Sequence, residues 1–369
     1  MHIVHCLTHS TIGGGQQVVY LLIKAFQKKY PETRITVILP SGGIYVERFK
    51  MLGLQIIEFP FDRISLINLI RIVKILQKLE PDVIHSHGKG AGLYTRFLPK
   101  FFLNVKNIHS YHGFHPPMGL IPRILYLWSE SMLLKKTDCV VNVSVSEQEF
   151  VNKMFNLRPN KSVVINNVID AKSIVEESNT EVPEQIRAFL NNPENKFIVI
   201  MIGRNDPIKN FPLAIETAQL IMKEKRSVAF LLVGLNEDDK LIQPLLKQFP
   251  GRVAAVGIVK NTPPLIKHSH LLLITSKREA FGMVILEAHA LGKPVVGTRV
   301  PGISENIKHY QNGILCDESP RVLADAISLL ENDQNLYEKM QRSALRAAAT
   351  MNVDVWVTQY QELYLNLFK

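Results

Sequence analysis

The chain has 369 residues, of which 46% are hydrophobic and 21% charged, a composition that suits a globular protein with two domains and separate cores. Its formal net charge is +10; residues 1–170 hold 20 Lys and Arg against 11 Asp and Glu (20 − 11 = +9), whereas residues 171–369 hold 23 against 22 (23 − 22 = +1). No run reaches the roughly 18 apolar residues of a membrane span, and the first residues lack the basic start and apolar core of a signal peptide. The three cysteines, Cys6, Cys139 and Cys316, are too few and too scattered for a disulfide framework or a zinc site. We therefore expect a cytoplasmic protein with reduced thiols.

Strands and helices alternate along the first half of the chain. Residues 2–7 form a short apolar strand, and a glycine-rich turn then leads into an amphipathic helix. The spacing of apolar residues predicts a second helix over 67–79. Further strands are predicted at 34–40, 54–60, 82–88, 104–113, 138–144 and 162–168. This alternation favours a parallel sheet covered by helices on both faces.

A second α/β series begins after a polar stretch. Hydrophobicity falls over residues 171–195, which we predict to be a linker and surface helix. The chain ends in an amphipathic helix over 351–369. Strands are predicted at 196–203, 227–234, 252–257, 270–276, 293–298 and 313–317. We therefore predict two Rossmann-like domains, residues 1–170 and 196–350, with a cleft between them and ligands at the carboxyl ends of the strands.

Three glycines, Gly13, Gly14 and Gly15, follow the first strand and precede a helix. Their backbone N–H groups would let an anion approach the helix N-terminus closely. The dinucleotide-binding fingerprint is not met, because Val18 stands where a third glycine is needed and no acidic residue follows at the required distance. A plain strand-to-helix turn is the alternative interpretation.

Two cations follow the first strand of the second domain, in the stretch "MIGRNDPIKN". Arg204 and Lys209 lie five residues apart in one loop and can bind a diphosphate from two sides. The alternative is a pair of solvated surface charges.

The stretch "SKREAFGMVILEAHALGKPVV" contains Glu279 in a loop and Glu287 in the helix that follows. We predict that the helix begins between residues 280 and 283, so that its first free N–H groups belong to Phe281, Gly282 and Met283 and point at a phosphate. The two carboxylates would lie roughly 12 Å apart at about 1.5 Å per helical residue. That spacing suits a nucleotide sugar, which has hydroxyls at both ends and phosphates between. Chance occurrence of two glutamates is the alternative, because Glu is common in helices.

The chain resembles the retaining GT-B glycosyltransferases of family four over nearly its whole length. One departure is Asn167, where that family often has glycine. The segments that carry the resemblance, in the family's order, are "HSHGKGAGLYTR…IHSYHGFH", "VNVSVSEQEFVNKM…SVVINNVID", "MIGRNDPIKNFPLAIETA" and "EAFGMVILEAHALGKPVVGTRVPGISENI".

The resemblance implies an acceptor-binding first domain, a nucleotide-sugar-binding second domain, and a final helix that crosses back to the first. Arg204 and Lys209 would bind the donor's diphosphate, Glu279 would hold the transferred sugar and Glu287 the ribose. His112 would face the donor sugar from the first domain. The remaining residues expected to line the donor are Gly14, Gly15, Gly203, Phe281, Gly282 and Met283.

The expected reaction is transfer of a hexose from a nucleotide sugar, with UDP as the family's commonest carrier, to a lipid-linked or envelope glycan such as lipopolysaccharide. Cations and helix N–H groups would stabilise the charge that grows on the diphosphate. The sequence has no D-x-D motif, so we expect neither a metal nor another cofactor. A nucleotide-sugar epimerase of the same fold and a catalytically silent scaffold are the alternatives. Nucleic-acid binding is not expected, because the basic half has no recognised module for it.

The basic first half predicts docking on anionic membrane at its cytoplasmic face, although the charge could serve only solubility. Two stretches mix basic with apolar residues. The first, residues 95–107, combines Arg96, Lys100 and Lys106 with Phe97, Phe101 and Phe102, and the second is residues 121–136, which end in Lys135 and Lys136.

Overall fold

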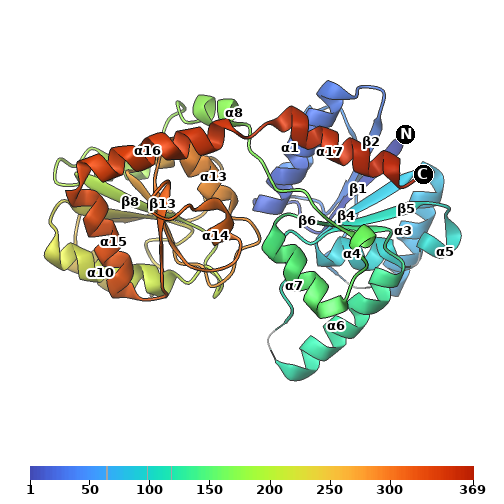
Figure 1. Cartoon of the computed structure of the whole chain (residues 1–369), viewed down its shortest axis with the longest axis horizontal. Helices are drawn as coiled ribbons and strands as arrows, with labels where there is room; N and C mark the ends of the chain where they lie inside the picture. The colour runs from blue at the N-terminus through green and yellow to red at the C-terminus, as the bar shows by residue number, and fades with distance from the viewer. Residues whose placement is uncertain (64, 98, 118) are drawn as a thin grey trace. The chain divides into compact units, whose positions relative to one another are not determined.

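The computed structural model describes residues 1–63, 65–97, 99–117 and 119–369, without the side chains of residues 101 and 159. The chain divides into two compact units (Figure 1). The first unit comprises Met1–Val168 together with Val353–Lys369, and the second comprises Ile169–Asn352. Each is built on its own sheet, as the two predicted series of strands require.

In the first unit, the described strands form a parallel sheet in the order β3-β2-β1-β4-β5-β6-β7. Strands β1 and β4 are buried along their whole length, as expected for strands covered on both faces. In the register of this pair His5 lies opposite His85, and Leu7 lies opposite His87. The strands are β1 His2–Leu7, β2 Arg34–Leu39, β3 Gln55–Glu58, β4 Val83–His87, β5 Lys106–Ser110, β6 Cys139–Asn142 and β7 Ser162–Val164.

The C-terminal helix α17 (Val353–Asn366) belongs to the first unit and packs against α1 (Gly14–Lys29), as predicted. The Lys29 ammonium donates hydrogen bonds of 2.7 Å to the carbonyl oxygen of Asp354 and to Oγ1 of Thr358. The other helices of this unit are α2 Ile44–Met51, α3 Leu66–Leu79, α4 Lys89–Arg96, α5 Pro99–Phe102, α6 Leu120–Lys135 and α7 Val145–Phe155, with a 3₁₀ turn at Pro159–Lys161.

The second unit repeats the design with the strand order β10-β9-β8-β11-β12-β13, again parallel. Its strands are β8 Phe197–Ile202, β9 Val228–Val233, β10 Val253–Ala255, β11 Leu271–Ile274, β12 Val295–Thr298 and β13 Gly313–Cys316. Its helices are α8 Ala171–Glu177, α9 Glu184–Leu190, α10 Phe211–Glu224, α11 Gln243–Gln248, α12 Pro263–Lys267, α13 Met283–Ala290, α14 Ile303–Asn306, α15 Pro320–Asn332 and α16 Gln334–Ala349.

Residues 171–195, which the falling hydrophobicity predicts to be a linker and surface helix, instead form α8 and α9 of the second unit. Ile186 and Phe189 of α9 are buried in a core cluster with strand residues such as Ile198. A few apolar residues are sufficient to anchor a short helix, and an average over a polar window conceals them. The structure therefore assigns this stretch to the second unit.

A buried ion pair joins α4 to α6 in the first unit. The guanidinium of Arg96 donates to the two carboxylate oxygens of Glu130 at 2.5 and 2.9 Å, and the Tyr111 hydroxyl donates to the same carboxylate at 2.6 Å. The exposed fractions of the two charged side chains are 1% and 3%. Burial alone would lower the pKa of the Arg96 guanidinium, but the charge and hydrogen bonds of Glu130 outweigh this effect and raise it.

Among the described residues, no helix combines the length and apolar character needed to cross a membrane.

Candidate functional site

Two loops of the second unit meet through an ion pair between Lys209 and Glu279, which are 70 positions apart in the sequence. Lys209 follows β8 and Glu279 follows β11, and these strands are neighbours in the sheet. The hydroxyl of Ser276 donates a second hydrogen bond to Glu279, at 2.9 Å. Only 22% of the Lys209 side chain and 13% of the Glu279 side chain are exposed. The structure thus brings together two residues predicted to act on one ligand.

The loop that carries Lys209 is held by its own hydrogen bonds. The carboxylate of Asp206 accepts from the backbone N–H groups of Ile208 and Lys209, both at 3.0 Å. The backbone N–H of Lys277 donates to the carbonyl oxygen of Ile208 at 2.8 Å. The hydroxyl of Thr275 donates to the carbonyl oxygen of Lys209 at 3.0 Å. These bonds tie the two loops to each other, so the ion pair is positioned before any ligand binds.

Gly203 and Arg204 lie at the carboxyl end of β8. A Cβ atom at Gly203 would lie 3.0 Å from Cγ of Lys209, so glycine leaves the room that the lysine stem occupies. Arg204 is 72% exposed and lies 3.5 Å from the carboxylate of Asp206. Its guanidinium therefore remains accessible to an anion at this edge of the sheet.

Helix α13 begins at Met283, within the predicted range, and Gly282 is its N-cap. Gly282 has a φ of 75°, and a Cβ atom there would lie 2.8 Å from Cδ1 of Ile285, so this position requires glycine. Within the described residues no side chain caps the helix, and its first turn has no acidic residue. Asn306 donates to the carbonyl oxygen of Phe281 and holds the entry to the helix in place. The first N–H groups of α13 can therefore meet an anion.

Glu287 lies on α13 and is half-buried, with Thr262 donating a hydrogen bond of 3.1 Å to its carboxylate. Burial raises the pKa of Glu287 to about 7, against the opposing effect of that hydrogen bond. A ligand hydroxyl that donates to Glu287 would favour the carboxylate form. The Glu287 carboxyl is thus placed at the helix surface, where a ligand hydroxyl could donate to it.

The first unit brings the glycine-rich turn close to His112. A Cβ atom at Gly15 would lie 3.3 Å from Cβ and Cγ of His112, so glycine allows the start of α1 to approach this ring. Gly14 is the first residue of α1, and within the described residues no side chain caps that helix. The backbone of His112 has a φ of 52°, which is unusual for a residue other than glycine.

Several further residues support the site, and most of them have no recognisable signal in the sequence. Glu147 accepts from the backbone N–H groups of Gly113 and Phe114 at 2.7 and 3.1 Å and so shapes the turn that holds His112. Ser276 and Thr262 bind the two glutamates. Ser276 could have been found from the sequence, because it is three residues before Glu279 at a strand end, but Thr262 and Glu147 have no such signal.

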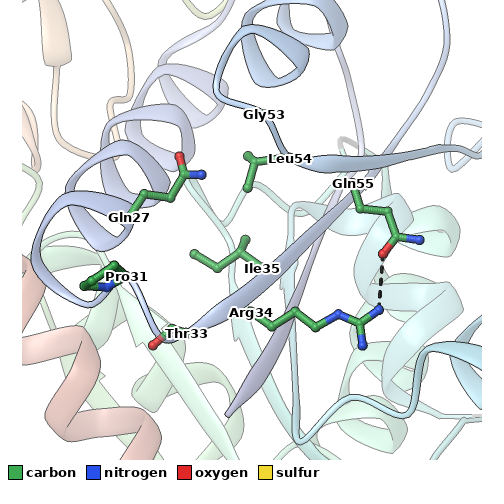
Figure 2. A pocket seen from close by; sticks show the side chains of 8 residues that line it. All are labelled: Gln27, Pro31, Thr33, Arg34, Ile35, Gly53, Leu54 and Gln55. Carbon is green, nitrogen blue, oxygen red and sulfur yellow. Dashed lines mark hydrogen bonds between the residues drawn. The ribbon is translucent and has the colours of Figure 1, made fainter.

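A hollow on the first unit lies away from these residues (Figure 2). Residues at the start of β2 and of β3 line it, and among them Arg34 donates to the side-chain oxygen of Gln55 at 3.4 Å. Ligands of parallel α/β sheets bind at the carboxyl ends of strands, and this hollow is at the amino ends. We assign it no role in the chemistry.

Comparison with known proteins identifies both halves of the chain. Residues 12–173 match the family described as Glycosyltransferase Family 4, and residues 182–346 match the family described as Glycosyl transferases group 1. The N-acetyl-alpha-D-glucosaminyl L-malate synthase of Bacillus anthracis is 26% identical over 339 residues, which cover 89% of this chain and 85% of that protein.

The N,N'-diacetylbacillosaminyl-diphospho-undecaprenol alpha-1,3-N-acetylgalactosaminyltransferase of Campylobacter jejuni is 25% identical over 362 residues, which cover 94% of each protein. Among solved structures, HepE of Anabaena in complex with UDP and glucose has a TM-score of 0.81 at 20% identity, covers 98% of both chains, and shows the shared fold. Because the two family matches together span most of the chain, and both of its sheets are the doubly wound type of the GT-B fold, the chain belongs to the GT-B glycosyltransferases of family four.

Proposed function

We propose that the protein is a retaining glycosyltransferase that moves a hexose from a UDP-sugar to a lipid-linked envelope glycan without a metal. The observation that carries the proposal is the Lys209–Glu279 pair beside the uncapped N-terminus of α13. The names of relatives support the donor and the acceptor: an Escherichia coli relative is named a UDP-Gal:alpha-D-GlcNAc-diphosphoundecaprenol alpha-1,3-galactosyltransferase, and HepE has been solved with UDP-glucose.

In this mechanism the bond between the anomeric carbon and the diphosphate oxygen breaks through an oxocarbenium-like state. Lys209, Arg204 and the first N–H groups of α13 stabilise the negative charge that grows on the diphosphate. Glu279 accepts hydrogen bonds from the sugar hydroxyls. The acceptor hydroxyl attacks from the face that the diphosphate leaves, and its proton passes to the departing diphosphate, so no carboxylate has to act as a base.

The function is tested by incubating the full chain with UDP-sugars and measuring UDP release with and without an undecaprenyl-diphosphate-linked sugar. We expect one donor to release UDP in proportion to the amount of new glycosidic linkage. NMR should show that the transferred sugar keeps the anomeric configuration it had in the donor. Conversion of the donor sugar to an epimer without acceptor would instead favour the epimerase. No turnover of any donor would favour the silent scaffold.

Activity is expected to survive chelation. Two cationic side chains and a helix N-terminus meet the diphosphate charge in this proposal, and a bound ion has no part in it. The measurement compares turnover in excess EDTA with turnover in EDTA already saturated with Mg²⁺, which controls for ionic strength. Loss of activity in EDTA that Mg²⁺ or Mn²⁺ restores would contradict metal independence.

We further propose that α6 docks the first unit on anionic membrane. One face of this helix exposes large apolar side chains, among which Trp128 is 66% exposed. Exposed basic residues, Arg123 and Lys135, lie on the same helix. Its one acidic residue, Glu130, is buried against Arg96, so the exposed face has no negative charge. The other exposed apolar residues of α6 are Leu120, Ile121, Ile124, Leu125 and Met132.

The other predicted docking stretch, residues 95–107, is not suited to this role. Arg96 is buried in its pair with Glu130, and Lys100 donates to the carboxylate of Asp138 at 2.6 Å. Phe102 is exposed, whereas the side chain of Phe101 lies outside the described residues. The spacing of charges in a sequence does not reveal which of them has a buried partner, and Arg96 must be removed from the proposed surface.

Docking predicts binding to liposomes that depends on charge and on α6. Basic residues near an anionic surface contribute about 1 kcal/mol each, and apolar side chains of such a helix enter the interface. We expect co-sedimentation of the full chain with phosphatidylglycerol liposomes at low salt, less at high salt, and little with neutral liposomes. The pair Ile121→Glu and Leu125→Glu should abolish binding.

The matched control is Val322→Glu, which places a charge on an exposed apolar residue of α15 in the second unit and should leave binding unchanged. Equal recovery of the unchanged protein with anionic and neutral liposomes at low salt would exclude docking. The proposed location is accordingly the cytoplasmic face of the membrane, where lipid-linked acceptors would be available.

A further inference from the structure

A chain of three hydrogen-bonded histidines crosses three neighbouring strand ends of the first unit. Nδ1 of His5, on β1, lies 3.0 Å from Nε2 of His87, at the end of β4. Nδ1 of His87 lies 2.9 Å from Nε2 of His112, which follows β5. The sheet order places β1 beside β4 and β4 beside β5, and these strands lie side by side in Figure 1.

A metal ion is the first alternative, because His5, His85 and His87 offer nitrogens within 4.8 Å of one another. The hydrogen bonds in the structure argue against it. His85 uses one ring nitrogen toward the Tyr364 hydroxyl at 2.8 Å and the other toward the Ser110 hydroxyl at 2.9 Å. Both nitrogens of His87 are engaged with the neighbouring histidines. Five of the six nitrogens therefore already have partners, since Nδ1 of His5 is bonded to His87.

All three rings of the chain are neutral at physiological pH. Burial lowers the pKa of His5 to about 3 and that of His112 to about 4, and burial together with the neighbouring histidines lowers that of His87 well below its usual value. A neutral imidazole has one N–H and one bare nitrogen. Each of the two hydrogen bonds needs one proton, so only two proton orders satisfy both bonds. In one order every ring is protonated at Nδ1, and in the other every ring is protonated at Nε2.

The two orders differ in where they leave an N–H without a partner. Within the described residues, Nε2 of His5 and Nδ1 of His112 are both buried and have no hydrogen-bond partner. Protonation at Nε2 would leave the orphan donor on His5, which has no exposed surface. Protonation at Nδ1 leaves it on His112, where that nitrogen is also buried but the ring as a whole is partly exposed. A ligand or water at the exposed side of the ring can bring an acceptor to His112, whereas nothing can reach His5, so the orphan N–H on His5 is the costlier arrangement.

We infer that His5 and His87 are positioning residues that hold His112 in its Nδ1–H tautomer. His87 donates to Nε2 of His112 and so occupies the one nitrogen that could otherwise accept a proton. His112 then offers a ligand a hydrogen-bond donor and cannot act as a base. Its contact with the transferred sugar rests on the proposed function, whereas its tautomer does not.

The unusual backbone of His112 is consistent with this role. A positive φ at a residue other than glycine is strained and persists only where the surroundings impose it. Here the bond from His87 holds the ring, and the Glu147 carboxylate holds the backbone of the two residues that follow. The ring is therefore fixed at both its side chain and its main chain.

The test is a long-range ¹H–¹⁵N correlation spectrum of the full chain labelled with ¹⁵N-histidine, in which protonated and bare ring nitrogens have separate shifts. The His112→Asn spectrum assigns the His112 signals. We expect Nδ1 of His112 to be protonated and Nε2 to be bare in the unchanged protein. A proton found on Nε2 would overturn the inference, whatever the activity of the protein.

Two variants test the role of His87. His87→Leu removes the donor, and we expect the proton of His112 to move to Nε2, the nitrogen that free neutral histidine prefers. His87→Asn keeps an amide donor near the Nδ1 position and should preserve the Nδ1–H form of His112. The matched control is His109→Leu, which removes an equally buried ring that bonds to Ser86 outside the chain of three and should leave His112 unchanged.

Unchanged His112 signals in His87→Leu would contradict the positioning role. If that variant does not fold, the spectrum of the unchanged protein still decides the proton order. Addition of UDP-glucose tests a separate point: a shift at Nδ1 of His112 supports its contact with donor. Absence of a shift would count against the proposed function and leave the tautomer result standing.

Discussion

Lys209→Ala and Glu279→Gln are expected to lower kcat about 10²-fold to 10³-fold while the fold is retained. Removal of one donor aimed at a developing negative charge typically has an effect of about this size. In the proposed mechanism Lys209 supplies such a donor to the departing diphosphate. Glu279→Gln keeps the shape of the side chain but removes the charge that pairs with Lys209 and that, in the proposed mechanism, accepts from the sugar hydroxyls.

Stability should change far less than turnover in these variants. The pair is partly exposed, and ion pairs of that kind contribute about 1 kcal/mol or less. Steady-state kinetics with the donor found by the screen, together with thermal unfolding, separates the two effects. Lys247→Ala on α11 and Glu216→Gln on α10 are matched exposed controls and should keep normal kcat. Near-normal turnover in Lys209→Ala or Glu279→Gln would show that the site is wrongly assigned.

Glu130→Ala is expected to destabilise the first unit by about 3–5 kcal/mol, because it leaves the Arg96 guanidinium buried without its counter-charge. The change also removes the acceptor of the Tyr111 hydroxyl. A loss of 1 kcal/mol lowers the melting temperature of a domain of this size by about 2–4 °C, so thermal unfolding should detect the effect clearly.

Two controls separate the buried charge from other effects. The double variant Arg96→Met with Glu130→Met removes both charges and should recover much of the lost stability, because apolar residues of similar volume often replace a buried ion pair without loss. Glu224→Gln breaks an exposed pair with Arg321 and should leave the melting temperature unchanged. A melting temperature of Glu130→Ala equal to that of the unchanged protein would contradict the prediction.

The sequence by itself determined the elements and the family. Strands that are buried on both faces appear as continuous apolar runs, so all of the predicted strands correspond to strands in the structure, from β1 to β13. The predicted start of the helix between residues 280 and 283 agrees with α13, which begins at Met283 after the N-cap Gly282. The motifs around Lys209 and Glu279 were recognisable because each lies in the loop that follows an apolar strand.

Only the tertiary structure decided which side chains meet. Lys209 reaches Glu279 because β8 and β11 are neighbours in the sheet, and a strand order that skips along the chain cannot be derived from local apolar patterns. The same reason hid the chain of three histidines, which exists because β1 pairs with β4 and β4 with β5. Arg96 looked like a surface charge because its partner is 34 positions away. Local sequence encodes secondary structure through periodicity and backbone preference, whereas burial and charge pairing depend on long-range packing that no single segment contains.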